Sequence, residues 1–261
     1  MTEMAKESRT QVMGILNVTP DSFFAGSRVN DEEALLKRVQ DMLSDGAAMI
    51  DVGACSTRPG SQFADSRMEA ERLEWSMPVI KSHFPDVPLS VDTFRPEIAR
   101  LCLEKWGRMV VNDISGGTPE MFEMLASNQA PYILTYNHQP ETDVIDDMKS
   151  FFDSQLAELD RYGVREVILD PGFGFAKSID DNYRIMAHLE AAQAYGLPVL
   201  VGISRKSMIF RLLGTTPADS LNGTTVLNTI SAMAGVEWLR VHDVKEAAET
   251  VRIVERMKQN L

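Results

Sequence analysis

The sequence predicts an α/β protein built as a single-domain, closed (β/α)8 barrel. Short apolar or β-branched runs alternate with longer amphipathic segments from one end of the chain to the other, and eight such runs occur. Near-continuous apolar strands joined by helices indicate a parallel sheet that is covered on both faces. The length of 261 residues suits one barrel of this kind, for which about 250 residues are typical.

The predicted strands are rich in Val, Ile, Leu and Met, and each is followed by polar residues. They are 12–18, 48–53, 88–93, 109–114, 132–137, 166–172, 198–204 and 238–244. No linker or low-complexity segment interrupts the series, so we expect one domain over residues 1–261, with residues 1–10 as a flexible tail. Counting strands does not prove closure, and an open doubly wound sheet is the alternative.

Helical segments lie between the predicted strands, and two of them have clear boundaries. In the segment 31–46, apolar residues recur at helical spacing, Asp31 is the expected N-cap and Gly46 the expected stop. The segment 179–196 ends in the same way, with Gly196 just before the next strand.

The composition restricts the function. The chain is 44% hydrophobic and 25% charged, which is ordinary for a globular protein. Its net charge of −12 and pI near 4.8 argue against a general nucleic-acid binder, because neutralising phosphates requires a basic face. An anionic small-molecule substrate remains compatible with this charge, since a local cluster of cations outweighs the global field at short range.

The cysteines and the chain start indicate the compartment. Cys55 and Cys102 form neither a metal-ligand pair nor a disulfide framework, which fits a reducing environment. The first residues, MTEMAKESRTQ, have no apolar targeting core, and no later run approaches the ~18 apolar residues of a membrane helix. We therefore expect a cytoplasmic protein that contacts neither a membrane nor nucleic acid.

Polar side chains follow every predicted strand. In a barrel these strand ends meet at the C-terminal rim, where the loops build the active site. Any one of them could cap a helix or begin a turn, and Asp51, Asp113 and Asp243 suit a role as caps or as residues that orient others. Caps do not call for lysine, arginine or histidine, however. The full set is Asn17, Asp51, Asp92-Thr93, Asn112-Asp113, Asn137-His138, Asp170, Ser204-Arg205-Lys206 and Arg240-His242-Asp243.

The strand-end residues divide into two chemistries. Asp92, Asn112 and Asp170 offer carboxylate and amide acceptors. Arg240 and His242 are two positions apart on one strand, so both side chains face the same side and offer an anion site. We expect a ligand with one edge rich in N–H donors and one end that carries phosphate or another anion.

Seven short segments resemble the signature segments of the dihydropteroate synthase family. In chain order they are GILNVTPDSF (14–23), STRPG (56–60), SVDT (90–93), NDISGG (112–117), LDPGFGFAK (169–177), GISRKS (202–207) and RVHDV (240–244). Each is short, so the specificity comes from the series, which keeps the family's order from Gly14 to Val244.

The resemblance implies a TIM-barrel transferase of folate biosynthesis. Such an enzyme joins 6-hydroxymethyl-7,8-dihydropterin diphosphate to 4-aminobenzoate and gives 7,8-dihydropteroate and diphosphate. The resemblance also implies that Mg²⁺ is a cofactor, that the protein forms a homodimer and that it is a target of sulfonamides.

Matching the family pattern position by position assigns roles to individual residues. The pterin is placed on Asp92, Asn112, Asp170 and Lys206. The diphosphate is placed near Asn17, Thr57, Arg58, Arg240 and His242, with Mg²⁺ at Asn17. Phe175 and Ser207 are placed beside the aminobenzoate.

The resemblance explains why a carboxylate ends a buried strand at Asp170. A pterin carries an amino group and a ring N–H side by side, and one carboxylate can accept from both in a bidentate arrangement. Pro171-Gly172 ends the strand sharply, so the Asp170 side chain can aim into the barrel mouth.

The implied reaction indicates a dissociative substitution. An arylamine is already neutral at pH 7 and needs no general base, whereas loss of diphosphate leaves a cation that is delocalised into the dihydropterin. Arg240, protonated His242 and Mg²⁺ would stabilise the leaving group, and Asp21 would stabilise the cation. We expect Asp21, Lys206, Arg240 and His242 to be catalytic, with the segments 19–30 and 56–65 as lids that exclude water.

The chain departs from the family pattern in three places. It reads GACSTRPG where GGESTRPG is common and PDSFFAGSR where PDSFSDGG is common, and its fifth strand ends in LTYNHQ instead of an LMH-type ending. The apolar stretch 223–235 could form a dimer face or could simply pack on the barrel.

Two alternative functions share the predicted pocket. One is a pterin-binding methyltransferase domain that moves a methyl group to a corrinoid protein, but a methyl donor has no diphosphate for the RVHDV strand to receive. The other is a non-catalytic pterin-binding homologue, against which retention of Asn17, Asp21, Thr57, Arg58, Arg240 and His242 argues.

Overall fold

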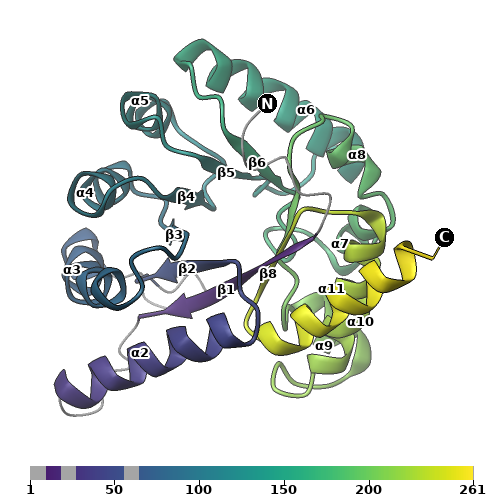
Figure 1. Ribbon diagram of the computed structural model, residues 1–261. Helices are drawn as coiled ribbons and strands as arrows, with labels where there is room; N and C mark the ends of the chain where they lie inside the picture. Colours follow the sequence, from purple (N-terminus) through teal and green to yellow (C-terminus); the bar gives the residue numbers. More distant parts are fainter. Residues whose placement is uncertain (1–9, 19–27, 56–64, 261) are drawn as a thin grey trace.

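The computed structural model describes residues 10–18, 28–55 and 65–260, and these form one barrel of eight parallel strands (Figure 1). All eight predicted strands are present. They are β1 (Gln11–Asn17), β2 (Met49–Gly53), β3 (Leu89–Asp92), β4 (Val110–Asp113), β5 (Tyr132–Thr135), β6 (Val167–Asp170), β7 (Leu200–Val201) and β8 (Trp238–Val241).

The sheet closes on itself. Its strand order is β6-β5-β4-β3-β2-β1-β8-β7, and every pairing is parallel. A parallel bridge then joins Leu169 of β6 to Val199, directly before β7. This bridge confirms the (β/α)8 barrel and excludes the open doubly wound sheet.

Helices surround the barrel and cover the outer face of the sheet (Figure 1). They are α2 (Arg28–Ser44), α3 (Ser66–His83), α4 (Pro96–Trp106), α5 (Pro119–Asn128), α6 (Val144–Tyr162), α7 (Ile179–Ala187), α8 (Glu190–Gln193), α9 (Ser207–Leu213), α10 (Leu221–Ala234) and α11 (Val244–Lys258). None of the helices within the described residues is long and apolar enough to cross a membrane.

Two helix predictions differ from the structure in their boundaries. Asp31 is not an N-cap, because α2 begins at Arg28 and Asp31 lies inside the helix. The predicted stop is close: α2 ends at Ser44, and Gly46 with φ +106° then redirects the chain toward β2.

The segment 179–196 is two helices instead of one. A capping box formed by Ser178 and Asp181 starts α7, as their exchange of hydrogen bonds shows. His188, with φ −130°, ends α7 before the single turn of α8 begins. The helical period of the sequence continues through this break, so the pattern alone does not reveal it.

The barrel interior is a packed core beneath a polar mouth. An inner cluster fills it with Met13, Met49, Val110, Ile133, Ile168, Leu200 and Trp238. Intervening strand residues such as Val12, Leu134 and Leu239 belong to the larger cluster under the helices. Because side chains alternate along a strand, the inner face of each strand can be followed from this cluster toward the strand's carboxyl end.

Thr10, the last residue of the predicted N-terminal tail, is held against the barrel. Thr10 is buried, and its Oγ1 donates to the carbonyl of Val236 at 2.7 Å. Residues 1–9, and residues 19–27 and 56–64 of the predicted lids, lie outside the described residues. The second predicted lid ends at Asp65, which is the N-cap of α3 and accepts a hydrogen bond from the Met68 N–H.

Candidate active site

The polar strand-end residues meet at the carboxyl end of the barrel. Cross-strand register runs from Asn17 on β1 through Gly53 and Asp92 to Asn112 on β4. Asn112 is almost fully buried, whereas the Asn17 side chain is only partly buried. Three of these four neighbouring strands, β1, β3 and β4, thus bring predicted site side chains to one rim.

Arg240 lies at the centre of a buried charge cluster. Its Nε donates to Asp51 Oδ2 at 2.6 Å, and its Nη2 donates to Asp92 Oδ2 at 2.5 Å. Asn112 Nδ2 donates to the same Asp51 oxygen at 3.0 Å. The Asp51 side chain is fully buried, so this residue orients Arg240 and Asn112 instead of capping a helix.

The charge cluster shifts the pKa values of Asp92 and Arg240. Burial, with the charge of Asp51 adding to it, raises the pKa of Asp92 to about 7, although Arg240 opposes the shift. Burial also opposes the charge on Arg240, but Asp51 and Asp92 outweigh it and hold the pKa of Arg240 above its ordinary value. The guanidinium therefore remains charged in the barrel, with two carboxylates against it.

Asp170 ends β6 inside the mouth, as predicted from the Pro-Gly break. It is 6% exposed, and its Oδ1 accepts the Gly172 N–H at 2.7 Å. Gly172 has φ +69°, and a Cβ there would lie 1.9 Å from the carbonyl oxygen of Tyr136. Because only glycine fits at this turn, the local sequence fixes the direction in which the strand end points.

Opposite charges share the space in front of Asp170. Burial raises the pKa of Asp170, while the charges of Lys206 and Arg240 act to lower it. Burial lowers the pKa of Lys206 to about 8, and Asp170 opposes this shift. Residues from β6, from the segment after β7 and from β8 therefore lie close enough to affect one another's charge.

Lys206 lies beside the segment predicted to face the aminobenzoate. Its Nζ donates to the carbonyl oxygen of Phe173 and lies 4.5 Å from the ring centroid of Phe175. Ser207 follows as the first residue of α9 and is partly buried. The three predicted residues Phe175, Lys206 and Ser207 are therefore neighbours.

A second lysine, Lys177, lies in this region, although it is not among the predicted site residues. Its Nζ donates to the carbonyl oxygens of Tyr136, Gly172 and Phe175 at 2.6, 3.0 and 3.3 Å. It also lies 4.0 Å from the Tyr136 ring centroid, and burial lowers its pKa to about 7. The sequence points to Lys177 only through its place in the LDPGFGFAK segment. Its hydrogen-bond partners are backbone carbonyls, which every residue has, so they cannot be predicted from residue types.

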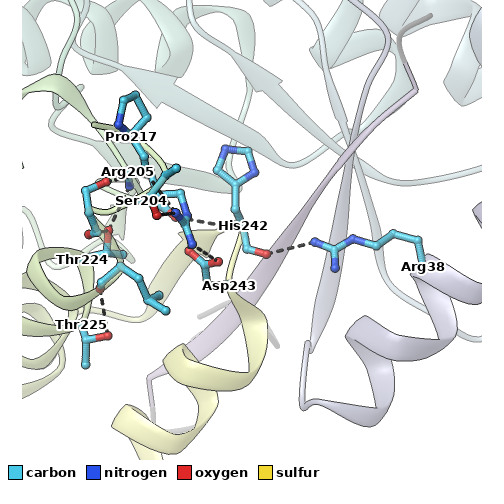
Figure 2. A network of polar contacts seen from close by, with 11 residues as sticks. Arg38, Ser204, Arg205, Pro217, Thr224, Thr225, His242 and Asp243 are labelled. Carbon is cyan, nitrogen blue, oxygen red and sulfur yellow. Dashed lines mark hydrogen bonds and ion pairs between the residues drawn. The ribbon is translucent and has the colours of Figure 1, made fainter. Parts of the chain in front are cut away.

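The backbone of His242 is held from two sides (Figure 2). Its N–H donates to Ser204 Oγ at 3.2 Å, and Arg38 of α2 donates to its carbonyl oxygen at 3.0 Å. Asp243 accepts from Arg205 Nε and Nη2, both at 2.9 Å, and makes no side-chain cap on α11. Asp243 thus orients the turn that carries His242.

Other strand-end residues hold the structure together instead of facing a ligand. Asp113 accepts from the Tyr132 hydroxyl at 2.9 Å and from the Ser115 N–H at 2.7 Å. At the unusual end of β5, Asn137 donates to the Ile114 carbonyl at 2.6 Å. His138 Nε2 and the Tyr136 hydroxyl both lie 2.6 Å from Asp147 Oδ1 of α6.

Three predicted site residues lie outside the described residues. They are Asp21, Thr57 and Arg58. The described part of the chain thus contains the predicted pterin contacts and part of the predicted diphosphate site.

Known proteins match this chain over nearly its whole length. A family model described as pterin binding enzyme matches residues 13–242. The dihydropteroate synthase of Escherichia coli K12 is 39% identical over 260 residues, with 95% of this chain and 92% of the relative covered.

Solved structures agree with these sequence matches. A Clostridium difficile dihydropteroate synthase, crystallised in the presence of pteroic acid, has a TM-score of 0.91 and 33% identity, covering 98% of this chain and 99% of that one. A Yersinia pestis dihydropteroate synthase with a sulfonamide drug has a TM-score of 0.87 and 37% identity, covering 97% and 95%. The chain therefore belongs to the pterin-binding enzyme family and, within it, to the dihydropteroate synthases.

Proposed function

We propose that the barrel mouth joins 6-hydroxymethyl-7,8-dihydropterin diphosphate to 4-aminobenzoate, with the pterin held deep and the diphosphate nearer the rim. The observation that carries the proposal is that Asp170, Lys206 and Arg240, from three places in the chain, lie near one another at the carboxyl end of the barrel and interact through their charges. Acceptors and cations lie side by side there, as a ligand with an N–H-rich edge and an anionic end requires.

Asp170 is the proposed anchor of the pterin. Its Oδ1 already accepts one backbone N–H, and a carboxylate has about four lone-pair positions, so it retains capacity for the amino group and ring N–H of the ligand. Asn112 and Asp92 would bind further polar atoms of the ring system. Lys206, held over Phe175, would bind a ring acceptor and lie next to the arriving aminobenzoate.

Arg240 and His242 are the proposed cations of the diphosphate half. Arg240 is committed to Asp51 and Asp92, so an arriving diphosphate must share the guanidinium with these carboxylates. The pKa of Asp92 near 7 eases that exchange, because a proton on Asp92 frees positive charge for the ligand. Asp51, which is fully buried, would keep Arg240 in place throughout.

The residues at Asn17 fit a magnesium ion. Asn17 Oδ1 and Asp92 Oδ2 both border Gly53, where an added Cβ would lie 3.4 and 3.5 Å from them. An ion there would be held by one protein oxygen, phosphate oxygens and water, the kind of ligand set that Mg²⁺ prefers. When bound, the ion supplies positive charge to the departing diphosphate.

The proposed reaction is dissociative. The bond between the methylene carbon and the diphosphate oxygen breaks, and its electron pair leaves with the diphosphate toward Arg240 and His242. The nitrogen lone pair of 4-aminobenzoate then forms the new C–N bond, and that nitrogen releases a proton. Asp21 is the proposed partner of the intermediate cation. The loss of one such electrostatic contact typically lowers the rate by about 10²–10³.

A binding and product assay tests the proposal. Purified protein with the pterin diphosphate, labelled 4-aminobenzoate and Mg²⁺ should form 7,8-dihydropteroate. In Asp170→Asn, an amide N–H₂ would face the ligand's donors, and we expect pterin affinity to fall by about 100-fold or more. Unchanged pterin affinity in this variant would remove Asp170 from the site, and absence of product from the wild type would refute the proposed activity.

Three further properties are proposed from the same relationships. Sulfonamides should compete with 4-aminobenzoate, since the structure of the Yersinia pestis relative contains such a drug. A cytoplasmic location fits the two buried cysteines, which no disulfide joins. A homodimer is supported by apolar side chains on α9 and α10 that remain exposed: Leu212, Leu213, Val226, Ile230 and Met233.

A further inference from the structure

The side chain of Thr135 is a buried polar group that the proposed site does not yet use. Thr135 is the last residue of β5 and is fully buried. Its Oγ1 has no hydrogen-bond partner among the described residues. A buried hydroxyl without a partner destabilises the fold, so its retention at this place calls for an explanation.

The position of Thr135 in its strand directs this hydroxyl into the barrel. Ile133, two residues earlier, belongs to the inner cluster that fills the barrel, whereas Leu134 belongs to the outer core. Since side chains alternate, Thr135 faces inward, one layer above Ile133 and nearer the mouth.

Thr135 is also the cross-strand partner of Asp170. The register of β5 and β6 pairs the two residues directly, and Asp170 shares the inward face because Ile168, two residues before it, lies in the inner cluster. The hydroxyl therefore stands beside the carboxylate that anchors the proposed ligand. A group bound to Asp170 comes within reach of Thr135.

The chemistry of a pterin supplies the missing partner. Its amino group and ring N–H, which Asp170 would bind, are flanked by acceptors on both sides, the ring carbonyl oxygen and a ring nitrogen. A threonine hydroxyl can donate to either of them.

We propose that the Thr135 hydroxyl donates a hydrogen bond to a pterin acceptor next to the edge held by Asp170, and so sets the specificity of this chain for its ligand. The inference rests on the proposed pterin site. It concerns this chain in particular, because Thr135 lies in LTYNHQ (134–139), one of the places where the sequence departs from the family pattern.

Calorimetric titration with 6-hydroxymethyl-7,8-dihydropterin diphosphate in the presence of Mg²⁺ tests the inference. Thr135→Val keeps the shape and removes the hydroxyl, and its affinity for the pterin should fall about tenfold. Thr135→Ser should retain the wild-type affinity. The KM for 4-aminobenzoate should stay unchanged in both variants, because this contact belongs to the pterin half.

Ser76 on α3 provides a matched control. It is also a fully buried hydroxyl without a hydrogen-bond partner in the described part of the chain, but it lies in the helical layer outside the barrel. Ser76→Ala should leave pterin affinity unchanged. Thermal unfolding of each variant without ligand shows whether it is folded, and we expect no loss of stability in Thr135→Val, since no hydrogen bond is removed.

The outcomes separate this inference from the proposed function. If the wild type binds the pterin and Asp170→Asn loses it, but Thr135→Val binds as the wild type does, the inference is overturned and the proposed function stands. Equal losses for the pterin and for 4-aminobenzoate would also overturn it, because they would indicate a general distortion of the mouth. If the wild type does not bind the pterin at all, both fail.

Discussion

Two side chains in the barrel mouth, Asp92 and Lys206, titrate near neutral pH. Asp92 and Lys206 have pKa values near 7 and 8, both because burial disfavours the charged form. In each case a neighbour of opposite charge opposes the shift of the pKa: Arg240 for Asp92 and Asp170 for Lys206. Small changes of pH near neutrality thus change the charge that a ligand meets.

The titration of Lys206 leads to a prediction for catalysis. With a pKa of about 8, the ammonium group loses its proton above that pH, so kcat/KM for the pterin substrate should decline above about pH 8. Arginine keeps its charge at high pH, and in Lys206→Arg the decline should move to higher pH. Lys37→Arg, at an exposed position on α2, is the control. The same alkaline limb in Lys206→Arg and the wild type would contradict the assignment.

The strand ends and the turns that follow them position these side chains. Between β6 and α7, Gly172 fits against the Tyr136 carbonyl only because it has no side chain, and Lys177 binds three carbonyls in the same segment. Tyr136 is in turn held through its hydroxyl by Asp147 of α6. The contacts that hold the segment between β6 and α7 are made by protein groups and not by a ligand.

We predict that Lys177→Met weakens both this element and the ligand site next to it. Three carbonyls in a part-buried segment would lose a donor, and the free energy of unfolding should fall by about 1–3 kcal/mol. KM for the pterin should rise because Asp170 is less firmly held, with kcat affected less. Chemical denaturation and steady-state kinetics measure the two effects.

Lys105→Met provides the comparison for Lys177→Met. Lys105 pairs with Glu74, and both side chains are more than two-fifths exposed, so removing this surface pair should change stability by less than about 1 kcal/mol. Equal effects of the two substitutions would show that the carbonyl contacts of Lys177 contribute nothing special.

At the scale of the whole molecule, α10 presents an apolar surface that the barrel does not bury. On α10, Val226, Ile230 and Met233 are 51%, 44% and 41% exposed, while the opposite face of the helix, with Leu227 and Ala232, packs on the barrel. One face of the stretch 223–235 thus packs on the barrel, and the other stays exposed, as the proposed dimer face requires.

We predict that Ile230→Glu separates the proposed homodimer. A carboxylate in an apolar interface is costly to desolvate, so sedimentation equilibrium should show a monomer at concentrations at which the wild type is a dimer. Ile253→Glu, at a 70% exposed position on α11, should leave the dimer intact. A monomeric wild type would contradict the proposal directly.

The sequence predicts the barrel well because strand content and helical period are local properties. It also predicts Asp92, Asn112, Asp170, Lys206 and Arg240 as neighbours, since strand ends of a parallel barrel share one rim. It does not reveal the break at His188, because no proline or glycine marks it. Nor does it reveal the pairing of Arg240 with Asp51 and Asp92, or the isolation of the Thr135 hydroxyl, since both depend on cross-strand register.

The close approach of Gly172 to the Tyr136 carbonyl has a consequence for inhibitor design. Any missense change at Gly172 adds a Cβ that the neighbouring backbone cannot admit, so resistance through this position would sacrifice the fold. A compound whose contacts rest on the Gly172 backbone would therefore touch a position with little mutational escape.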